Sequence, residues 1–113
     1  MTHYLISFPG SAMDLSEKEF EAAGRDAHAV IQEAKHAGVY VFGGGIAEDV
    51  PPFRVQIDGS VTDDSYPETR VLTGGFMILE LDSRAEAIKW AEKTAVSCRC
   101  AQEVREFMYD PES

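Results

Sequence analysis

The segment Gly75-Phe76-Met77-Ile78-Leu79-Glu80-Leu81 decides the fold of this chain, because it reads as a β-strand with apolar side chains on both faces. Alternate residues of a strand point to opposite faces of the sheet. Phe76 and Ile78 therefore share one face, and Met77, Leu79 and Leu81 share the other. An antiparallel sheet with one face in water alternates apolar and polar residues, and this strand does not. We expect both faces of the sheet to be covered.

A helix earlier in the chain has clear signals at both ends. Ser16-Glu17-Lys18-Glu19 has the form of a capping box, in which the serine and glutamate side chains each accept a hydrogen bond from the other residue's backbone amide. Apolar residues then recur every three or four positions from Phe20 to Ala34, which is the helical period. Gly38 stands where helices commonly end. We predict a helix that begins at Ser16 and ends at Gly38.

The remaining elements complete a βαββαβ order. Strands are predicted at residues 3 to 8, from residue 39 into the glycines at 43 to 45, and near residues 101 to 108. Ser83 begins a second helix with another capping-box pattern. Asp58-Gly59 predicts a β-hairpin with a two-residue turn, inserted between the second and third main strands. Residues 1–113 therefore form one α+β domain of ferredoxin-like topology.

The two helices can cover only one face of such a sheet, so the face with Phe76 and Ile78 needs another cover. A second copy of the chain is the simplest candidate, because an exposed apolar face of this kind marks an interaction surface. We therefore predict a homodimer formed through the sheet face.

The net charge of the chain indicates which classes of binding partner are unfavourable. Twenty acidic residues against ten basic ones give a net charge of −10 among 113 residues. Such a surface repels nucleic acid and anionic membranes, which are bound mainly through Lys and Arg. No stretch approaches the roughly 20 apolar residues of a membrane span, and the first residues carry no basic signal-peptide region. We expect no nucleic-acid partner, no membrane association and a cytoplasmic location.

The motifs for cofactors and metals are missing from the sequence. The glycines at 43 to 45 lack the GK[ST] ending of a phosphate loop and do not match the dinucleotide fingerprint. Cys98 and Cys100 have no nearby cysteine or histidine to complete a zinc site, and their spacing in a strand is near the outer limit for a disulfide. We expect no cofactor, no bound metal and two free thiols.

Three features are candidates for chemistry. His28 lies at the edge of the apolar helix stripe, where histidines are more often structural than catalytic. Its functional interpretation is a general acid or base, since imidazole changes charge near neutral pH. The loop at residues 62 to 69 gathers Asp63, Tyr66 and Glu68, and is a polar pocket wall or a solvated turn. The run Gly43-Gly44-Gly45, within a strand, indicates close approach of a ligand, a bulge or a sharp bend.

These residues also resemble a known family. Arg25-Asp26-Ala27-His28 resembles the Arg-x-x-His signature of YCII-related proteins. The run from Asp58-Gly59 through Thr62-Asp63 and residues 66–70 to Gly74-Gly75-Phe76 is similar to their DGPF branch, named for an Asp-Gly-Pro-Phe motif. This sequence departs at the motif itself, with Asp-Asp-Ser-Tyr at residues 63–66. The resemblance covers nearly the whole chain.

The resemblance implies a dimeric α/β barrel, in which two ferredoxin-like sheets pack face to face. It also implies an active-site pocket with a histidine and an aspartate, which here are His28 and Asp63. Some relatives act as lyases or dehydrochlorinases on small aromatic compounds, and others are accessory or binding modules.

Two functions follow from these observations. In the first, the chain is a cofactor-independent acid–base enzyme in which His28 moves a proton and Asp63 orients the imidazole. Tyr66, Glu68, Arg25 and Gly44 are then candidates for substrate contacts. In the alternative, the same pocket holds a small molecule without converting it, as a binding or regulatory module.

Overall fold

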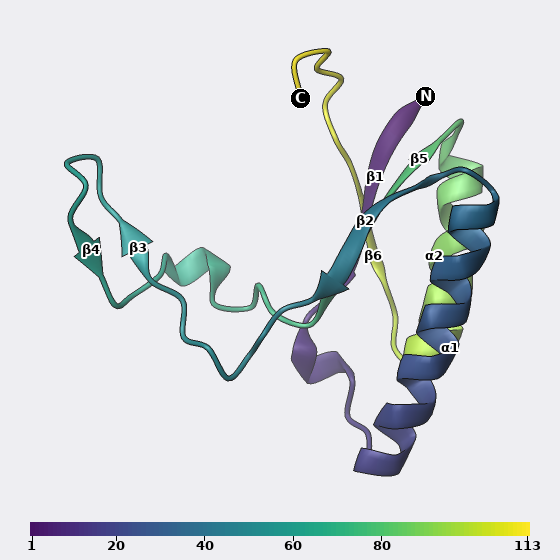
Figure 1. Cartoon of the computed structure of the whole chain (residues 1–113), viewed down its shortest axis with the longest axis horizontal. Helices are drawn as coiled ribbons and strands as arrows, with labels where there is room; N and C mark the ends of the chain where they lie inside the picture. Colours follow the sequence, from purple (N-terminus) through teal and green to yellow (C-terminus); the bar gives the residue numbers. More distant parts are fainter.

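Four strands form one antiparallel sheet with the order β2-β5-β1-β6, and two helices pack on it (Figure 1). The computed structural model describes residues 1–113. The main elements are β1 (Thr2–Phe8), α1 (Glu17–His36), β2 (Tyr40–Gly45), β5 (Gly75–Leu81), α2 (Arg84–Cys98) and β6 (Glu103–Glu106). This order confirms the ferredoxin-like α+β fold predicted from the sequence.

The helix ends follow the sequence signals closely. The Ser16 hydroxyl accepts a hydrogen bond from the Glu19 amide at 3.2 Å and donates to the Glu19 carboxylate at 2.8 Å, so the capping box is complete. At the start of α2 only half of the predicted box forms. Ser83 accepts from the Glu86 amide at 3.3 Å, whereas the Glu86 carboxylate lies 3.7 Å from Lys89.

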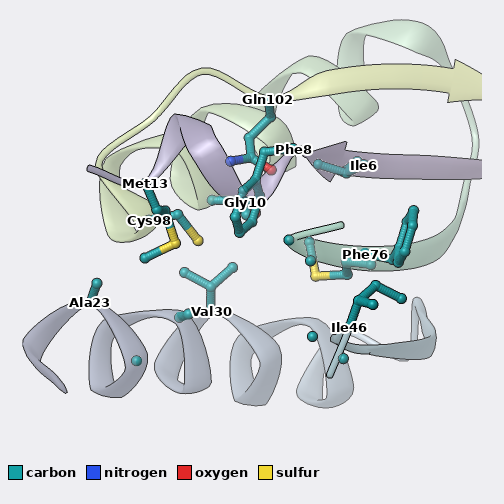
Figure 2. Close-up of a pocket in the computed structure, with 18 of the residues that line it drawn as sticks. Ile6, Phe8, Gly10, Met13, Ala23, Val30, Ile46, Phe76, Cys98 and Gln102 are labelled. Atoms are coloured by element: carbon teal, nitrogen blue, oxygen red, sulfur yellow. The ribbon is translucent and has the colours of Figure 1, made fainter. Parts of the chain in front are cut away.

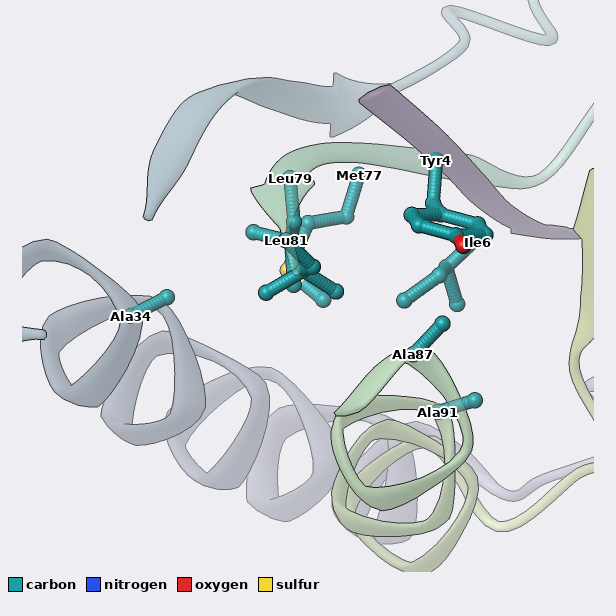
Figure 3. Close-up of a cluster of buried hydrophobic side chains, with 8 residues drawn as sticks. All are labelled: Tyr4, Ile6, Ala34, Met77, Leu79, Leu81, Ala87 and Ala91. Atoms are coloured by element: carbon teal, nitrogen blue, oxygen red, sulfur yellow. The ribbon is translucent and has the colours of Figure 1, made fainter. Parts of the chain in front are cut away.

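The hydrophobic core lies between the helices and one face of the sheet (Figure 3). Leu79 and Leu81 from β5 and Ile6 from β1 are the largest fully buried side chains. The helices meet them with small residues, because Ala34 of α1 and Ala87 of α2 are completely buried. Small side chains at these points let the helix backbones lie close to the sheet.

The opposite face of the sheet is not covered by either helix, and it carries an apolar patch beside charged residues such as Glu80 and Arg105. The strand register pairs Ile78 with both Leu5 and Phe42, and it pairs Phe76 with Ser7. The Phe42 side chain is 66% exposed. The strand β5 therefore has apolar residues on both faces, as its sequence predicts.

Residues 46–74, here called the arm, leave the sheet between β2 and β5 and carry the inserted hairpin (Figure 1). The hairpin consists of β3 (Arg54–Val55) and β4 (Val61–Thr62), followed by the short 3-10 helix η2 (Pro67–Thr69). The arm gives the chain a radius of gyration of 15.6 Å, compared with about 13 Å for a compact domain of this length. Its apolar side chains are mostly exposed, among them Phe53, Val55, Ile57 and Val61.

The turn of this hairpin is longer than the sequence predicts. The Gln56 amide donates to the Ser60 carbonyl at 2.8 Å, which leaves three residues in the loop instead of two. Gly59 adopts a positive φ of 89° and donates to the Gln56 carbonyl at 2.9 Å. A glycine in this conformation is usual for three-residue hairpin loops. The dipeptide Asp58-Gly59 thus correctly predicts a hairpin, but the loop has three residues instead of two and is closed by Gln56 and Ser60.

Replacing Ser16 by alanine is expected to lower the free energy of unfolding by about 1 kcal/mol, the usual cost of losing a serine N-cap. Urea denaturation followed by far-UV circular dichroism measures the change. Ser11, an exposed serine without a side-chain hydrogen bond, provides the control. Ser11→Ala should change stability by less than about 0.5 kcal/mol.

The same variant has a defined pH dependence. Hydrogen bonds from the Ser16 hydroxyl and amide hold the pKa of the Glu19 carboxyl below its ordinary value. A lowered carboxyl pKa stabilises the fold above that ordinary value, and the contribution is lost as the pH falls through the folded pKa. The stability gap between wild type and Ser16→Ala should therefore shrink between neutral pH and about pH 3. A gap that widens in acid would contradict this assignment.

Candidate functional site

A cavity of about 460 Å³ lies between α1, α2 and the end of the sheet from which the arm departs (Figure 2). Figure 2 shows α1 as its floor, with Ala23 and Val30 pointing up toward Phe8, Met13 and Cys98. Most of the lining is apolar, and the volume is typical of small-molecule sites. The cavity is therefore the best candidate for a functional site.

Small residues on α1 create this space. Ala23, Gly24 and Ala27 occupy the part of the helix that faces the cavity. A Cβ atom added at Gly24 or Gly44 would meet no other heavy atom within 4 Å, so both glycines border open space. The cavity is thus a consequence of side-chain size along one helix face, with Gly44 at its other wall.

Few polar side chains reach this cavity. His28, with an exposed side chain, lines it from α1. The Thr94 hydroxyl donates to the Trp90 carbonyl at 2.9 Å, so its hydrogen is already used. Gln102 donates from Nε2 to the Cys100 carbonyl at 3.2 Å, whereas its Oε1 is buried and has no partner. The lining therefore contains one imidazole, and the unpaired Gln102 acceptor is closed off from the cavity.

Glu48, at the root of the arm, supplies the one carboxylate of the lining. Its position depends on Gly10, because a Cβ atom at residue 10 would overlap the Glu48 carboxylate. Sequence reasoning missed Glu48. The Pro9-Gly10 dipeptide indicated only the end of a strand, and no local pattern links Gly10 to a carboxylate so far along the chain.

Comparison with protein-family models matches residues 4–107 to the YCII-related domain. The chain belongs to this family. Among curated proteins, the comparison found no match. Among solved structures, it is similar to 5-chloro-2-hydroxyhydroquinone dehydrochlorinase from Burkholderia phenoliruptrix AC1100, in complex with 2,5-dihydroxybenzoquinone. That match has 15% sequence identity, covers 97% of each chain and has a TM-score of 0.47, which is too low to support an argument about function.

The YCII-related chain brings two of the expected site residues to the cavity. His28 and Gly44 both line it. Arg25 is exposed on α1 and does not line the cavity. Asp63, like Tyr66 and Glu68, belongs to the arm, which Figure 1 shows extending away from α1. Within one chain, Asp63 is therefore not placed beside His28.

Asp64, the neighbour of Asp63, has a structural role in the arm. The Arg54 guanidinium donates to Asp64 at 3.2 Å, and the Thr62 hydroxyl donates to the same carboxylate at 2.6 Å. Arg54 also lies over the Tyr66 ring, 5.2 Å from its centroid. These contacts hold the Asp-Asp-Ser-Tyr turn at residues 63–66 together, and they leave the Asp63 carboxylate exposed.

Two of the three consecutive glycines, Gly43 and Gly44, differ in their surroundings. The register of β2 on β5 shifts between Tyr40 and Phe42, which indicates a bulge. A Cβ atom at Gly43 would lie 2.9 Å from the Phe76 carbonyl oxygen, so this position requires glycine. Gly44 instead borders the cavity. Close backbone approach therefore explains Gly43, whereas the bulge lies just before the glycines.

Neither metal ligands nor a membrane helix is found. No group of three or more His, Cys, Asp or Glu side chains is placed to hold a metal ion. Neither helix is long and apolar enough to cross a membrane. Both cysteines are free thiols, with Cys98 buried and lining the cavity.

Cys98 provides a probe of this cavity. Burial raises the pKa of its thiol above the ordinary value, with smaller opposing effects from Ser97 and Arg99. Because the thiolate is the reactive species, iodoacetamide at about pH 8 should modify Cys98 more slowly in the folded protein than Cys100, which is less buried. Trypsin cleaves at Arg99, so mass spectrometry follows the two peptides separately. Equal rates in the folded protein would contradict this prediction, whereas equal rates in guanidinium chloride are expected.

Proposed function

We propose that this YCII-related protein is a small-molecule enzyme that uses acid–base chemistry without a cofactor, in the manner of a lyase or dehydrochlorinase. The observation that supports the proposal is an imidazole, His28, at a largely apolar cavity of small-molecule size. The other histidines, His3 and His36, do not line this cavity. The free thiols fit a reducing compartment, and we propose a cytoplasmic location.

His28 is suited to proton transfer because imidazole both accepts and donates protons near neutral pH. In an elimination, the neutral ring removes a proton from a substrate carbon. The released electron pair forms the new double bond as the leaving group departs with its own electrons. The imidazolium then returns its proton to water, so the histidine ends as it began.

We further propose that the chain works as a homodimer formed through the uncovered sheet face. This face carries an apolar patch made by Leu5, Phe42, Phe76 and Ile78, beside charged residues of β5 and β6. In such a dimer, the arm of one copy extends away from its own sheet and helices. Its exposed apolar side chains would then pack against the other copy. In this arrangement Asp63 acts on His28 of the partner copy, since within one chain the two residues are apart.

The alternative is a binding or regulatory module with the same cavity. The observation that favours it is that the exposed His28 ring forms no hydrogen bond within one chain. A general base without an orienting partner is less well prepared for catalysis. This alternative predicts that a ligand stabilises the protein without being converted.

Substituting His28 by glutamine is expected to lower turnover by about 10²- to 10⁴-fold, the usual contribution of a positioned general acid or base. Conversion of small hydroxylated and halogenated aromatic compounds, followed by liquid chromatography and mass spectrometry, provides the measurement. His36→Gln is the control, because His36 lies on the same helix away from the cavity. Turnover that survives His28→Gln would exclude the acid–base role, and binding without any conversion would favour the binding module.

Placing a charge on the sheet face is expected to separate the dimer. Ile78→Asp buries a carboxylate in the proposed interface, whereas Val96→Asp adds the same charge at a 73% exposed position on α2. Sedimentation velocity should show monomers for Ile78→Asp and dimers for wild type and Val96→Asp.

If Asp63 acts across the interface, Asp63→Asn should shift the NMR resonances of the His28 ring in the dimer only. A monomeric wild type would contradict the proposal.

A further inference from the structure

We propose that Gly24 determines which ligands the cavity accepts, because its missing side chain leaves room beside His28 for a broad ligand group. The ligand class that fits is an apolar molecule with a ring next to the group on which His28 acts. This inference rests on the proposed function, since it concerns the same cavity. It adds the residue that limits the size of the ligand.

Gly24 lies at the centre of the part of α1 that borders the cavity. On a helix, the surface neighbours of a residue stand three, four and seven positions away. Gly24 has four such neighbours that line the cavity, as it does itself: Phe20, Ala27, His28 and Ile31. At about 100° of rotation per residue, Gly24 stands between Ile31 and His28 around the helix. A ligand that reaches His28 from the apolar side of the cavity therefore lies over Gly24.

The two usual reasons for a glycine do not apply at this position. Glycine is favoured where φ is positive, and Gly24 is not among the glycines with such a φ, which are Gly38, Gly59 and Gly74. Glycine is also required where another atom comes too close for a Cβ atom, as at Gly43. A Cβ atom at residue 24 would meet nothing within 4 Å. Neither the backbone conformation nor the packing of the chain therefore requires this glycine.

A glycine in the interior of a helix also weakens the fold. Gly24 lies more than one turn from either end of α1. Glycine loses more conformational freedom on folding than alanine does, so alanine would be the more stable choice here. No contact within one chain offsets this loss. Space for a ligand does offer a reason, because ligand atoms can then contact the helix backbone directly.

The direction of helical side chains brings the His28 ring toward the same space. The Cα–Cβ bonds of a helix tilt toward its N-terminus, so a side chain covers the turn that precedes its own Cα atom. For His28 that turn includes Gly24, four residues earlier in α1. The imidazole and the bare backbone thus border one space. A ring can lie against the backbone at Gly24 while its reacting group faces the imidazole.

Two substitutions at residue 24 and one elsewhere on α1 form a matched set. Gly24→Ala adds one methyl group, and it should raise the Tm by about 3 °C, because alanine is the better helix former. Gly24→Leu fills the space over the helix backbone with a branched side chain. Ala29→Leu enlarges an exposed residue of α1 that does not line the cavity, so it is the control for added apolar volume.

NMR titration with two hydroxyl compounds of different shape tests the proposal. β-Naphthol is a rigid pair of fused rings, whereas n-octanol is a flexible chain that can bend around an obstacle. In the wild type, β-naphthol should bind saturably and shift the His28 ring resonances. Its Kd should rise about tenfold in Gly24→Leu and about threefold in Gly24→Ala, the range for small changes of volume in an apolar pocket. The Kd of n-octanol should change less than about twofold, and Ala29→Leu should leave both values unchanged.

Three results would overturn the inference. These are an unchanged Kd of β-naphthol in Gly24→Leu, no saturable binding of β-naphthol up to about 1 mM, and a lower Tm in Gly24→Ala, which would mean that packing requires the glycine. Should Gly24→Leu fail to fold, the Kd in Gly24→Ala decides.

The titration requires no conversion of the probe, so it separates this inference from the proposed enzyme. A protein that binds β-naphthol over Gly24 and converts no compound would contradict the enzyme and leave the inference standing. Turnover that depends on His28, together with an unchanged Kd of β-naphthol in Gly24→Leu, would do the reverse.

Discussion

The burial of Leu79 and Leu81 beneath two helices is the constraint on which the rest of the structure depends. Both side chains are almost completely buried, and both lie on the central strand β5, which pairs with β1 and β2. Because alternate residues point to opposite faces, fixing these two side chains inward turns Ile78 outward. The same packing sets where α1 lies against the sheet. The core and the uncovered face therefore both follow from one strand.

The position of α1 also explains why the cavity lies at one end of the sheet. Ala34, near the end of this helix, is buried against the core. Toward the start of the helix, Gly24 and Ala27 leave part of the space between helix and sheet unfilled. The C-terminal part of α1 thus packs against the core, whereas its N-terminal part lines a cavity of ligand size.

Much of the fold was predictable from the sequence because its signals are local. The capping box at Ser16, the hairpin at Asp58-Gly59 and the two-sided strand around Ile78 each depend on neighbouring residues. The site was predictable only in part. Helical periodicity places His28 at the cavity. The position of the Glu48 side chain instead depends on Gly10, a residue far away in the sequence whose missing side chain leaves room for the carboxylate. Periodicity does not encode such an approach.

The arm has a consequence for how this protein can change over evolutionary time. Arg54, Thr62 and Asp64 stabilise its turn among themselves, and the hairpin strands pair only with each other. A mutation in the turn therefore changes contacts within the arm and does not disturb the packing around Leu79. Selection can alter the tip of such an element independently of the domain that carries it. The arm is in this sense a separable unit of variation attached to a fixed scaffold.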